Sequence, residues 1–198
     1  MVTTRHTRTR AAVLGGLVLV LALAGCTADT DAKSGADPGP VPTVEPPTIT
    51  DTPPATLDPE AAEKTAVLSV YSAMWAEQMK AYAKADATGT KLRKYASLDA
   101  LSKFELDLAQ MKKAGTVGTG TLGHTPTVTM LDLTGKLPKA TVQDCIDLTG
   151  WKAVRTKTGQ PIPLPSAQPR RYVATATAEK WPTGWMVTDY TPDGARTC

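Results

Sequence analysis

Asp144 is the residue of this sequence whose position best suits acid–base chemistry. It lies in the strand-like run ATVQDCIDL (140–148), where alternate residues share a face. The face that carries Asp144 is otherwise apolar and consists of Ala140, Val142, Ile146 and Leu148. An acid on such a face can point into a cavity and act there as a general base. The alternative is a structural acid held by hydrogen bonds or by an ion pair with Arg155 or Arg171.

Five aromatic residues form a second group of candidates, because they could line a pocket around that acid. They are Tyr71, Trp75, Trp151, Trp181 and Trp185. At helix and strand spacing, such side chains also fill cores. Tyr71 and Trp75 are the aromatic residues that we expect in a cavity with Asp144, and Asp132 is a second candidate base.

His124 is the one histidine beyond the N-terminal segment, so a zinc site or a Ser-His-Asp set would have to use it. No G-x-S-x-G motif is present, and we expect His124 at the surface or at a strand edge. Residues 118–123 match G-x-G-x-x-G, but Thr-rich strand sequence follows where a dinucleotide site needs a helix. The sequence therefore predicts no catalytic histidine, no metal site and no cofactor.

The first 25 residues have the pattern of an export signal. A basic head with Arg5, Arg8 and Arg10 precedes AAVLGGLVLVLALA (11–24), fourteen residues without a charge. As a helix this run would rise only about 21 Å, which is short of a hydrocarbon core of roughly 30 Å. The pattern therefore favours a signal peptide over a permanent membrane span.

The end of this segment, Leu23-Ala24-Gly25-Cys26, resembles the lipobox of bacterial lipoproteins. The resemblance implies that the Cys26 thiol receives a diacylglyceryl group and that the chain is cleaved before it. Fatty acyl chains such as palmitate would then anchor the protein on the extracytoplasmic face of the cell membrane. Ordinary cleavage after Ala24 is the alternative, because Ala22-Leu23-Ala24 also fits the A-x-A pattern.

The remaining two cysteines, Cys145 and Cys198, are expected to form a disulfide. When Cys26 is set aside as the lipidated residue, an even number of cysteines is left, and an exported chain usually joins these in disulfides. A metal pair or a reactive thiol is the alternative, although no histidine lies near either cysteine in the sequence.

Charge and composition separate the rest of the chain into a linker and a folded part. From Cys26 onward the chain has 19 basic and 19 acidic residues, which argues against nucleic-acid binding by charge alone. Residues 27–57 include seven prolines and almost no large apolar side chain, as in a disordered spacer. We therefore predict a signal peptide over 1–25, a lipidated cysteine with a Pro-rich linker over 26–57, and one domain over 58–198.

The elements that must position the candidates are helices first and strands afterwards. Apolar residues at spacings of three and four predict a helix over 59–86 that begins at Asp58-Pro59, and a second helix from Ser97 to Gly115. The five segments in which the period changes to two are 125–134, 140–148, 151–157, 170–181 and 184–190. Tight hairpins are expected at 148–151 and 181–184, and an exposed loop at 158–169. The predicted fold is therefore α+β, with N-terminal helices packed on a curved antiparallel sheet.

This order of elements resembles the nuclear transport factor 2-like fold, a cone-shaped α+β domain, over residues 58–198. The chain also resembles small secreted lipoproteins of actinobacteria in the runs ATVQDCID (140–147), RRYVATAT (170–177) and GWMVTDYTPDGARTC (184–198). The resemblance implies a fold and a location, since such domains include isomerases, ligand-binding proteins and assembly scaffolds. The ketosteroid-isomerase-like members of the fold use an acid in their cavity.

These observations predict a non-enzymatic function. We expect a membrane-anchored extracytoplasmic lipoprotein that acts as a binding or scaffold module for an envelope protein or a small ligand. One alternative is an isomerase-like or ligand-binding cavity in which Asp144 or Asp132 is the base. Another alternative is an accessory of an envelope secretion or conjugation channel, some of whose proteins share the fold.

Overall fold

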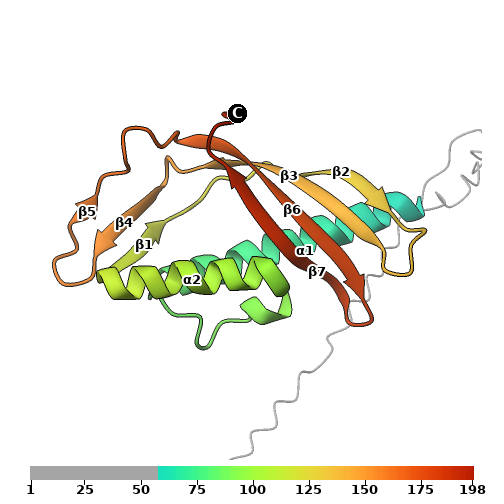
Figure 1. Cartoon of the computed structure of the whole chain (residues 1–198), viewed down its shortest axis with the longest axis horizontal. Coiled ribbons are helices and arrows are strands. Elements are labelled where there is room, and N and C mark those ends of the chain that lie inside the picture. Colours follow the sequence, from blue (N-terminus) through green and yellow to red (C-terminus); the bar gives the residue numbers. More distant parts are fainter. Residues whose placement is uncertain (1–57) are drawn as a thin grey trace, which may run out of the picture. The chain divides into compact units, whose positions relative to one another are not determined.

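A computed structural model describes residues 58–198 (Figure 1). The predicted signal peptide, Cys26 and the predicted linker lie outside the described residues. The elements in chain order are α1 (Pro59–Tyr82), η1 (Leu92–Lys94), α2 (Leu98–Ala114), β1 (Thr116–Gly120), β2 (Thr127–Asp132), β3 (Lys139–Asp147), β4 (Trp151–Arg155), β5 (Pro161–Ile162), β6 (Arg171–Trp181) and β7 (Gly184–Asp193).

Helix α1 begins where the sequence predicts. The Asp58 carboxylate accepts the backbone N–H of Glu60 at 3.0 Å, and Pro59 occupies the first turn, where no hydrogen-bond donor is needed. The helix ends at Tyr82, four residues before the predicted end at 86, because the chain turns and Ala85 adopts a left-handed conformation with φ of 49°.

Helix α2 ends as predicted, since Gly115 has φ of 64°, a conformation that costs glycine little. Its buried side chains are Ala100, Phe104 and Leu108. Leu98, which the sequence places on the same apolar face, is 59% exposed instead. Leu98 is the first residue of the helix and has φ of 47°, so its side chain does not follow the helical periodicity.

The strands form two antiparallel sheets rather than one. The larger sheet has the order β2-β3-β6-β7, and the hairpin predicted at 181–184 joins β6 to β7. The smaller sheet has the order β1-β4-β5. The hairpin predicted at 148–151 is wrong: a tight turn is present, with Trp151 N–H donating to the Leu148 carbonyl at 3.1 Å. After this turn, however, β4 does not pair with β3, because β2 and β6 already pair with the two edges of β3. Strand β4 pairs with β1 and β5 instead.

Both helices lie on the same side of the larger sheet (Figure 1). The side chains buried between these layers include Tyr71 and Met74 of α1, Phe104 of α2, and Ile146 and Val187 of the sheet. The predicted α+β class, helices packed on antiparallel strands, is thereby confirmed, and the strands of residues 58–198 form no closed barrel. None of the helices in this described part is long and apolar enough to cross a membrane.

A disulfide joins Cys145 of β3 to Cys198, with the two Cα atoms 5.9 Å apart. The same terminal segment is also bound by its backbone, since Val173 N–H donates to the Arg196 carbonyl at 2.8 Å. The predicted pairing of these two cysteines is therefore present, and it holds the end of the described chain against the sheet.

Candidate functional site

Asp144 lies on β3, in the interior of the larger sheet, and is 1% exposed. As predicted, its face of the strand is the buried one, and it points toward the helices. One carboxylate oxygen, Oδ2, accepts the Tyr71 hydroxyl at 2.9 Å and lies 2.7 Å from Nδ1 of His124. The other oxygen, Oδ1, accepts the backbone N–H of Thr125 at 2.6 Å. A buried acid with three such partners is fully hydrogen-bonded.

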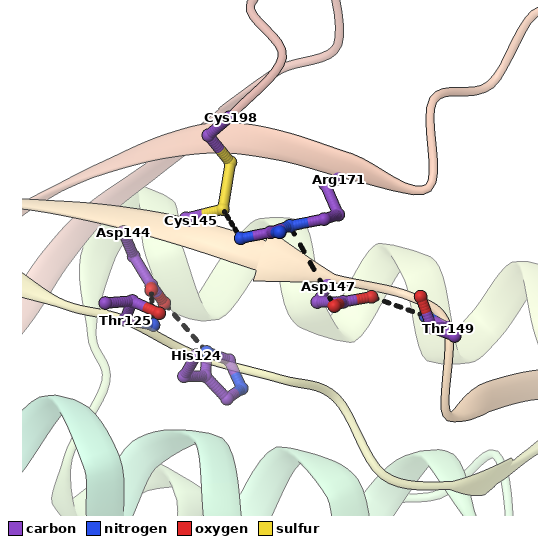
Figure 2. Close-up of a disulfide and its surroundings, with 8 residues drawn as sticks. All are labelled: His124, Thr125, Asp144, Cys145, Asp147, Thr149, Arg171 and Cys198. Atoms are coloured by element: carbon purple, nitrogen blue, oxygen red, sulfur yellow. Dashed lines mark hydrogen bonds and ion pairs between the residues drawn. A yellow bond between two sulfur atoms is a disulfide. The ribbon is translucent and has the colours of Figure 1, made fainter.

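The predicted ion pair of Asp144 with Arg155 or Arg171 is wrong. Arg171 lies on the other face of the sheet, where its side chain contacts Asp147 at 3.9 Å and the sulfur of Cys145 at 3.4 Å (Figure 2). Residues 144 and 145 point in opposite directions because successive side chains of a strand alternate. The hydrogen-bonded alternative is thus the correct one for Asp144.

The segment that links β1 to β2, residues 121–126, brings His124 to the acid. Gly123 and Asp147 form an isolated antiparallel bridge, which holds this segment beside β3. A Cβ atom on Gly123 would lie 2.8 Å from the Cβ atom of Asp147, so only glycine allows so close an approach. His124 and Thr125 follow directly and reach Asp144 (Figure 2).

The contact with Asp144 determines which nitrogen of His124 carries the proton. A carboxylate accepts hydrogen bonds and does not donate them, so Nδ1 must be the donor. In the neutral ring, Nε2 then has the free lone pair. The ring also lies against two aromatic side chains, Trp75 with centroids 4.9 Å apart and Tyr71 with centroids 6.4 Å apart.

His124 is one wall of a pocket of about 360 Å³, here called the His124 pocket. Its lining consists of Tyr71, Ser72, Trp75, Ala76 and Met79 of α1, and of Gly120, Thr121, Leu122, His124 and Pro126. This lining contains no Asp, Glu, Lys or Arg among the described residues. The side chain of His124 is 23% exposed, whereas that of Asp144 is closed off behind it. The pocket is therefore apolar, with an imidazole as its one basic group.

Trp75 also lines a second pocket of about 370 Å³, here called the Tyr190 pocket. The aromatic side chains that line the Tyr190 pocket are Trp75, Tyr82, Trp151, Tyr172 and Tyr190. Asp107 also lines it and accepts the Tyr82 hydroxyl at 3.4 Å. Although Asp107 keeps part of its surface in solvent, the protein packed around it raises the pKa of its carboxyl group. The two pockets share Trp75 and Leu122.

Several buried polar atoms beside these pockets have no hydrogen-bond partner within residues 58–198. They include Nε1 of Trp75, Nε1 of Trp151 and the hydroxyl of Tyr190. Such an atom costs about 1–3 kcal/mol unless something binds it. Burial raises the pKa of Tyr190, and burial with the nearby Asp144 carboxylate raises that of Tyr71. Both tyrosines therefore keep their protons, and Tyr71 donates its proton to the hydrogen bond with Asp144.

The other predicted residues divide between the pockets and the exterior. Tyr71, Trp75 and Asp144 do come together, and Trp151 lines the Tyr190 pocket. Trp181 and Trp185 line neither pocket; they donate to Glu179 and Glu63 at the far end of the sheet. Asp132 is exposed and accepts hydrogen bonds from Thr134, so it is not the base of a cavity. Cys26 lies outside the described residues.

His124 is the residue that the sequence analysis missed. It is partly buried and bonded to Asp144, not a surface or strand-edge side chain as expected. Twenty residues separate the two, and their meeting depends on the bridge between Gly123 and Asp147. The one local signal is the glycine before His124, which permits a close backbone approach. Within residues 58–198, no group of three His, Cys, Asp or Glu could hold a metal ion.

The chain matches no protein-family model and no curated protein. Among solved structures it is similar to the intermembrane-space region of the chloroplast protein ARC6, with 17% identity and a TM-score of 0.42 over 70% of this chain and 98% of that one. It is also similar to the Kfla4162 protein from Kribbella flavida, with 12% identity and a TM-score of 0.40 over 70% of this chain and 95% of that one.

Proposed function

We propose that this chain is an exported lipoprotein whose α+β domain, of the nuclear transport factor 2-like kind, binds a small ligand. A diacylglyceryl group on Cys26 would anchor it on the extracytoplasmic face of the cell membrane, as in small actinobacterial lipoproteins. The N-terminal pattern and the Leu23-Ala24-Gly25-Cys26 motif support this location. The disulfide between Cys145 and Cys198 fits an oxidising compartment.

The observation that carries the binding function is the pair of pockets that share Trp75 as a lining residue. Each has a volume of about 360–370 Å³, at the lower end of the range for small-molecule sites. Aromatic walls favour a ligand with a flat apolar ring. The hydroxyl groups of Ser72 and Thr121, which line the His124 pocket, favour a ligand that also has a hydrogen-bond acceptor.

The binding function is favoured over a pure scaffold because two pockets with aromatic walls are present. A scaffold that acts through its outer surface needs no such pocket, whereas Trp75 lines two of them. For an accessory of a secretion or conjugation channel, nothing in residues 58–198 gives specific support, and that alternative stays a prediction from the sequence.

Binding can be tested with 2-naphthol, a fluorescent ring with one hydroxyl group. The full chain in lipid nanodiscs should bind it saturably, measured by tryptophan fluorescence against empty nanodiscs. Trp75→Phe should weaken this binding about three- to tenfold, because the larger indole wall is lost. Trp181→Phe is the matched control, since Trp181 lines neither pocket. No saturable binding, or equal weakening in both variants, would contradict the proposal.

A further inference from the structure

We propose that the His124 pocket is a proton-transfer site, in which Nε2 of His124 is the general base and Asp144 is its positioning residue. The substrate class is a small uncharged carbon acid, a molecule with a C–H bond next to an electron-withdrawing group. The proposal rests on the proposed binding function, because the pocket must admit a small molecule.

The geometry assigns the base to the histidine and not to the acid. Both carboxylate oxygens of Asp144 are occupied by donors, and the side chain is fully buried behind the pocket wall. His124 lines the pocket and has one nitrogen, Nε2, free of the contact with Asp144. A proton acceptor must reach the substrate, and of these two residues only His124 does so.

The surroundings of His124 hold it in the state that a base requires. Asp144 fixes the proton on Nδ1, and the carboxylate stabilises the imidazolium ion that forms when Nε2 takes up a proton. Tyr71 and Thr125 in turn fix the carboxylate. Trp75 and Tyr71 limit rotation of the ring. Each of these contacts reduces the reorganisation that proton transfer would otherwise need.

The lining of the pocket restricts the substrate. Since no charged Asp, Glu, Lys or Arg side chain of the described residues lines it, an ionised substrate would lose its hydration without gaining a partner. The hydroxyl groups of Ser72 and Thr121 are the donors available to an oxygen on which negative charge develops. A neutral molecule of one ring, with a carbonyl or similar group beside the acidic C–H, meets these conditions.

The probe that tests this chemistry without knowledge of the natural substrate is 5-nitrobenzisoxazole. Nε2 removes the ring proton next to the nitrogen, and the C–H electron pair becomes the third bond of a nitrile. The ring N–O bond breaks, and its electrons leave with the oxygen as a coloured phenolate. The imidazolium ion then returns its proton to water, so the reaction needs no oxidant, reductant or second substrate.

The full chain in nanodiscs should open this ring with saturation kinetics. His124→Gln should lower kcat by about 10²-fold or more, the usual contribution of a positioned base. In His124→Ala, added imidazole should restore part of the lost rate. Lys157→Gln changes an exposed side chain that lines neither pocket and is the control for ring opening by surface groups.

The role of Asp144 needs a readout besides rate. In the wild-type chain, the ¹⁵N spectrum of His124 should show the proton on Nδ1. In Asp144→Asn the proton should be shared between the two nitrogens, and kcat should fall with KM nearly unchanged. Near-ultraviolet circular dichroism excludes variants that have lost their packing.

Two results would overturn the proposal: ring opening that is equal in His124→Gln and the wild type, or a wild-type His124 whose proton lies on Nε2. If 2-naphthol binds saturably while ring opening stays at the level of empty nanodiscs, the proton-transfer proposal fails and the binding function stands. If 2-naphthol does not bind and ring opening still depends on His124, the binding test fails and the base assignment stands.

Discussion

Gly123, in the segment between β1 and β2, and Asp147, at the end of β3, exchange two backbone hydrogen bonds, each 2.9 Å long. This bridge is the only place where residues 121–126 pair with β3, and it sets the position of His124. A side chain at position 123 would meet the Asp147 Cβ atom at 2.8 Å.

Gly123→Ala should therefore move the segment away from β3 and break the contact between His124 and Asp144. We expect a loss of about 1–3 kcal/mol in the free energy of unfolding, as for other overpacked sites. Denaturant unfolding measures the loss, and the ¹⁵N spectrum of His124 reports the broken contact. Gly194→Ala is the matched control, because its added Cβ would meet nothing within 4 Å. Equal stability of the two variants would show that the bridge does not constrain the segment.

Removal of the disulfide should destabilise the domain. The bridge closes a separation of 53 residues, for which the chain-entropy model gives about 4 kcal/mol as an upper value. The double variant Cys145→Ser/Cys198→Ser should unfold at lower denaturant concentration than the oxidised wild type. A reductant should bring the wild type close to the double variant and leave the double variant unchanged. If the reductant does not change the denaturant concentration at which the wild type unfolds, the bridge adds no stability.

Glu63 should make the stability depend on pH. Hydrogen bonds from Lys180 and then from Trp185, at 2.7 Å, hold the pKa of Glu63 below its ordinary value of 4.5. A carboxyl group whose pKa is lowered by folding adds stability above its unfolded pKa, and this stability is lost as the pH falls through the folded pKa. Since both side chains of the ion pair are partly exposed, we expect a gain of only about 1 kcal/mol at neutral pH.

The measurement is the difference in unfolding free energy between wild type and Glu63→Gln. It should be largest at neutral pH and should shrink below the ordinary pKa of 4.5. Glu105→Gln, which removes a more exposed ion pair with Arg93, should have a smaller effect. A difference that does not change with pH would refute the assignment.

Cys26→Ala should abolish the lipid anchor. The variant should incorporate no labelled palmitate and should leave the membrane fraction, or remain unprocessed with its N-terminal segment attached. The physical reason is that stable anchoring of this kind needs acyl chains on the thiol. The double variant Cys145→Ser/Cys198→Ser should incorporate as much labelled palmitate as the wild type. Unchanged detergent-phase partitioning of a processed Cys26→Ala chain would count against the lipoprotein proposal.

The parts of the fold that the sequence predicts are those set by local chemistry. The start of α1 at Asp58 and the end of α2 at Gly115 follow from capping, and the hairpin at 181–184 follows from its turn residues. The split into two sheets is not predicted, because the turn at 148–151 is compatible with either partner for β4. Pairing of β4 with β1 is a long-range choice that no local pattern expresses.

In the candidate site, too, the features set by local patterns are predicted and those set by long-range pairing are not. Alternation along β3 places Asp144 on the buried face, and helix spacing places Tyr71 and Trp75 in the interior. The identity of the third partner, His124, depends on the register between two segments joined by one bridge. Since a single backbone pairing leaves no periodicity in the sequence, the sequence alone predicts a surface position for this histidine.

Asp144 and Cys145 are neighbours in sequence, yet they face opposite sides of β3 (Figure 2). A thiol reagent that reaches the bridge from solvent therefore approaches the sheet from its outer side and does not have to pass through the His124 pocket. A small molecule in that pocket, conversely, is screened from the sulfur atoms by the backbone of the strand. The disulfide and the His124 pocket thus lie on opposite faces of one strand, and each can be manipulated in the laboratory without direct interference from the other.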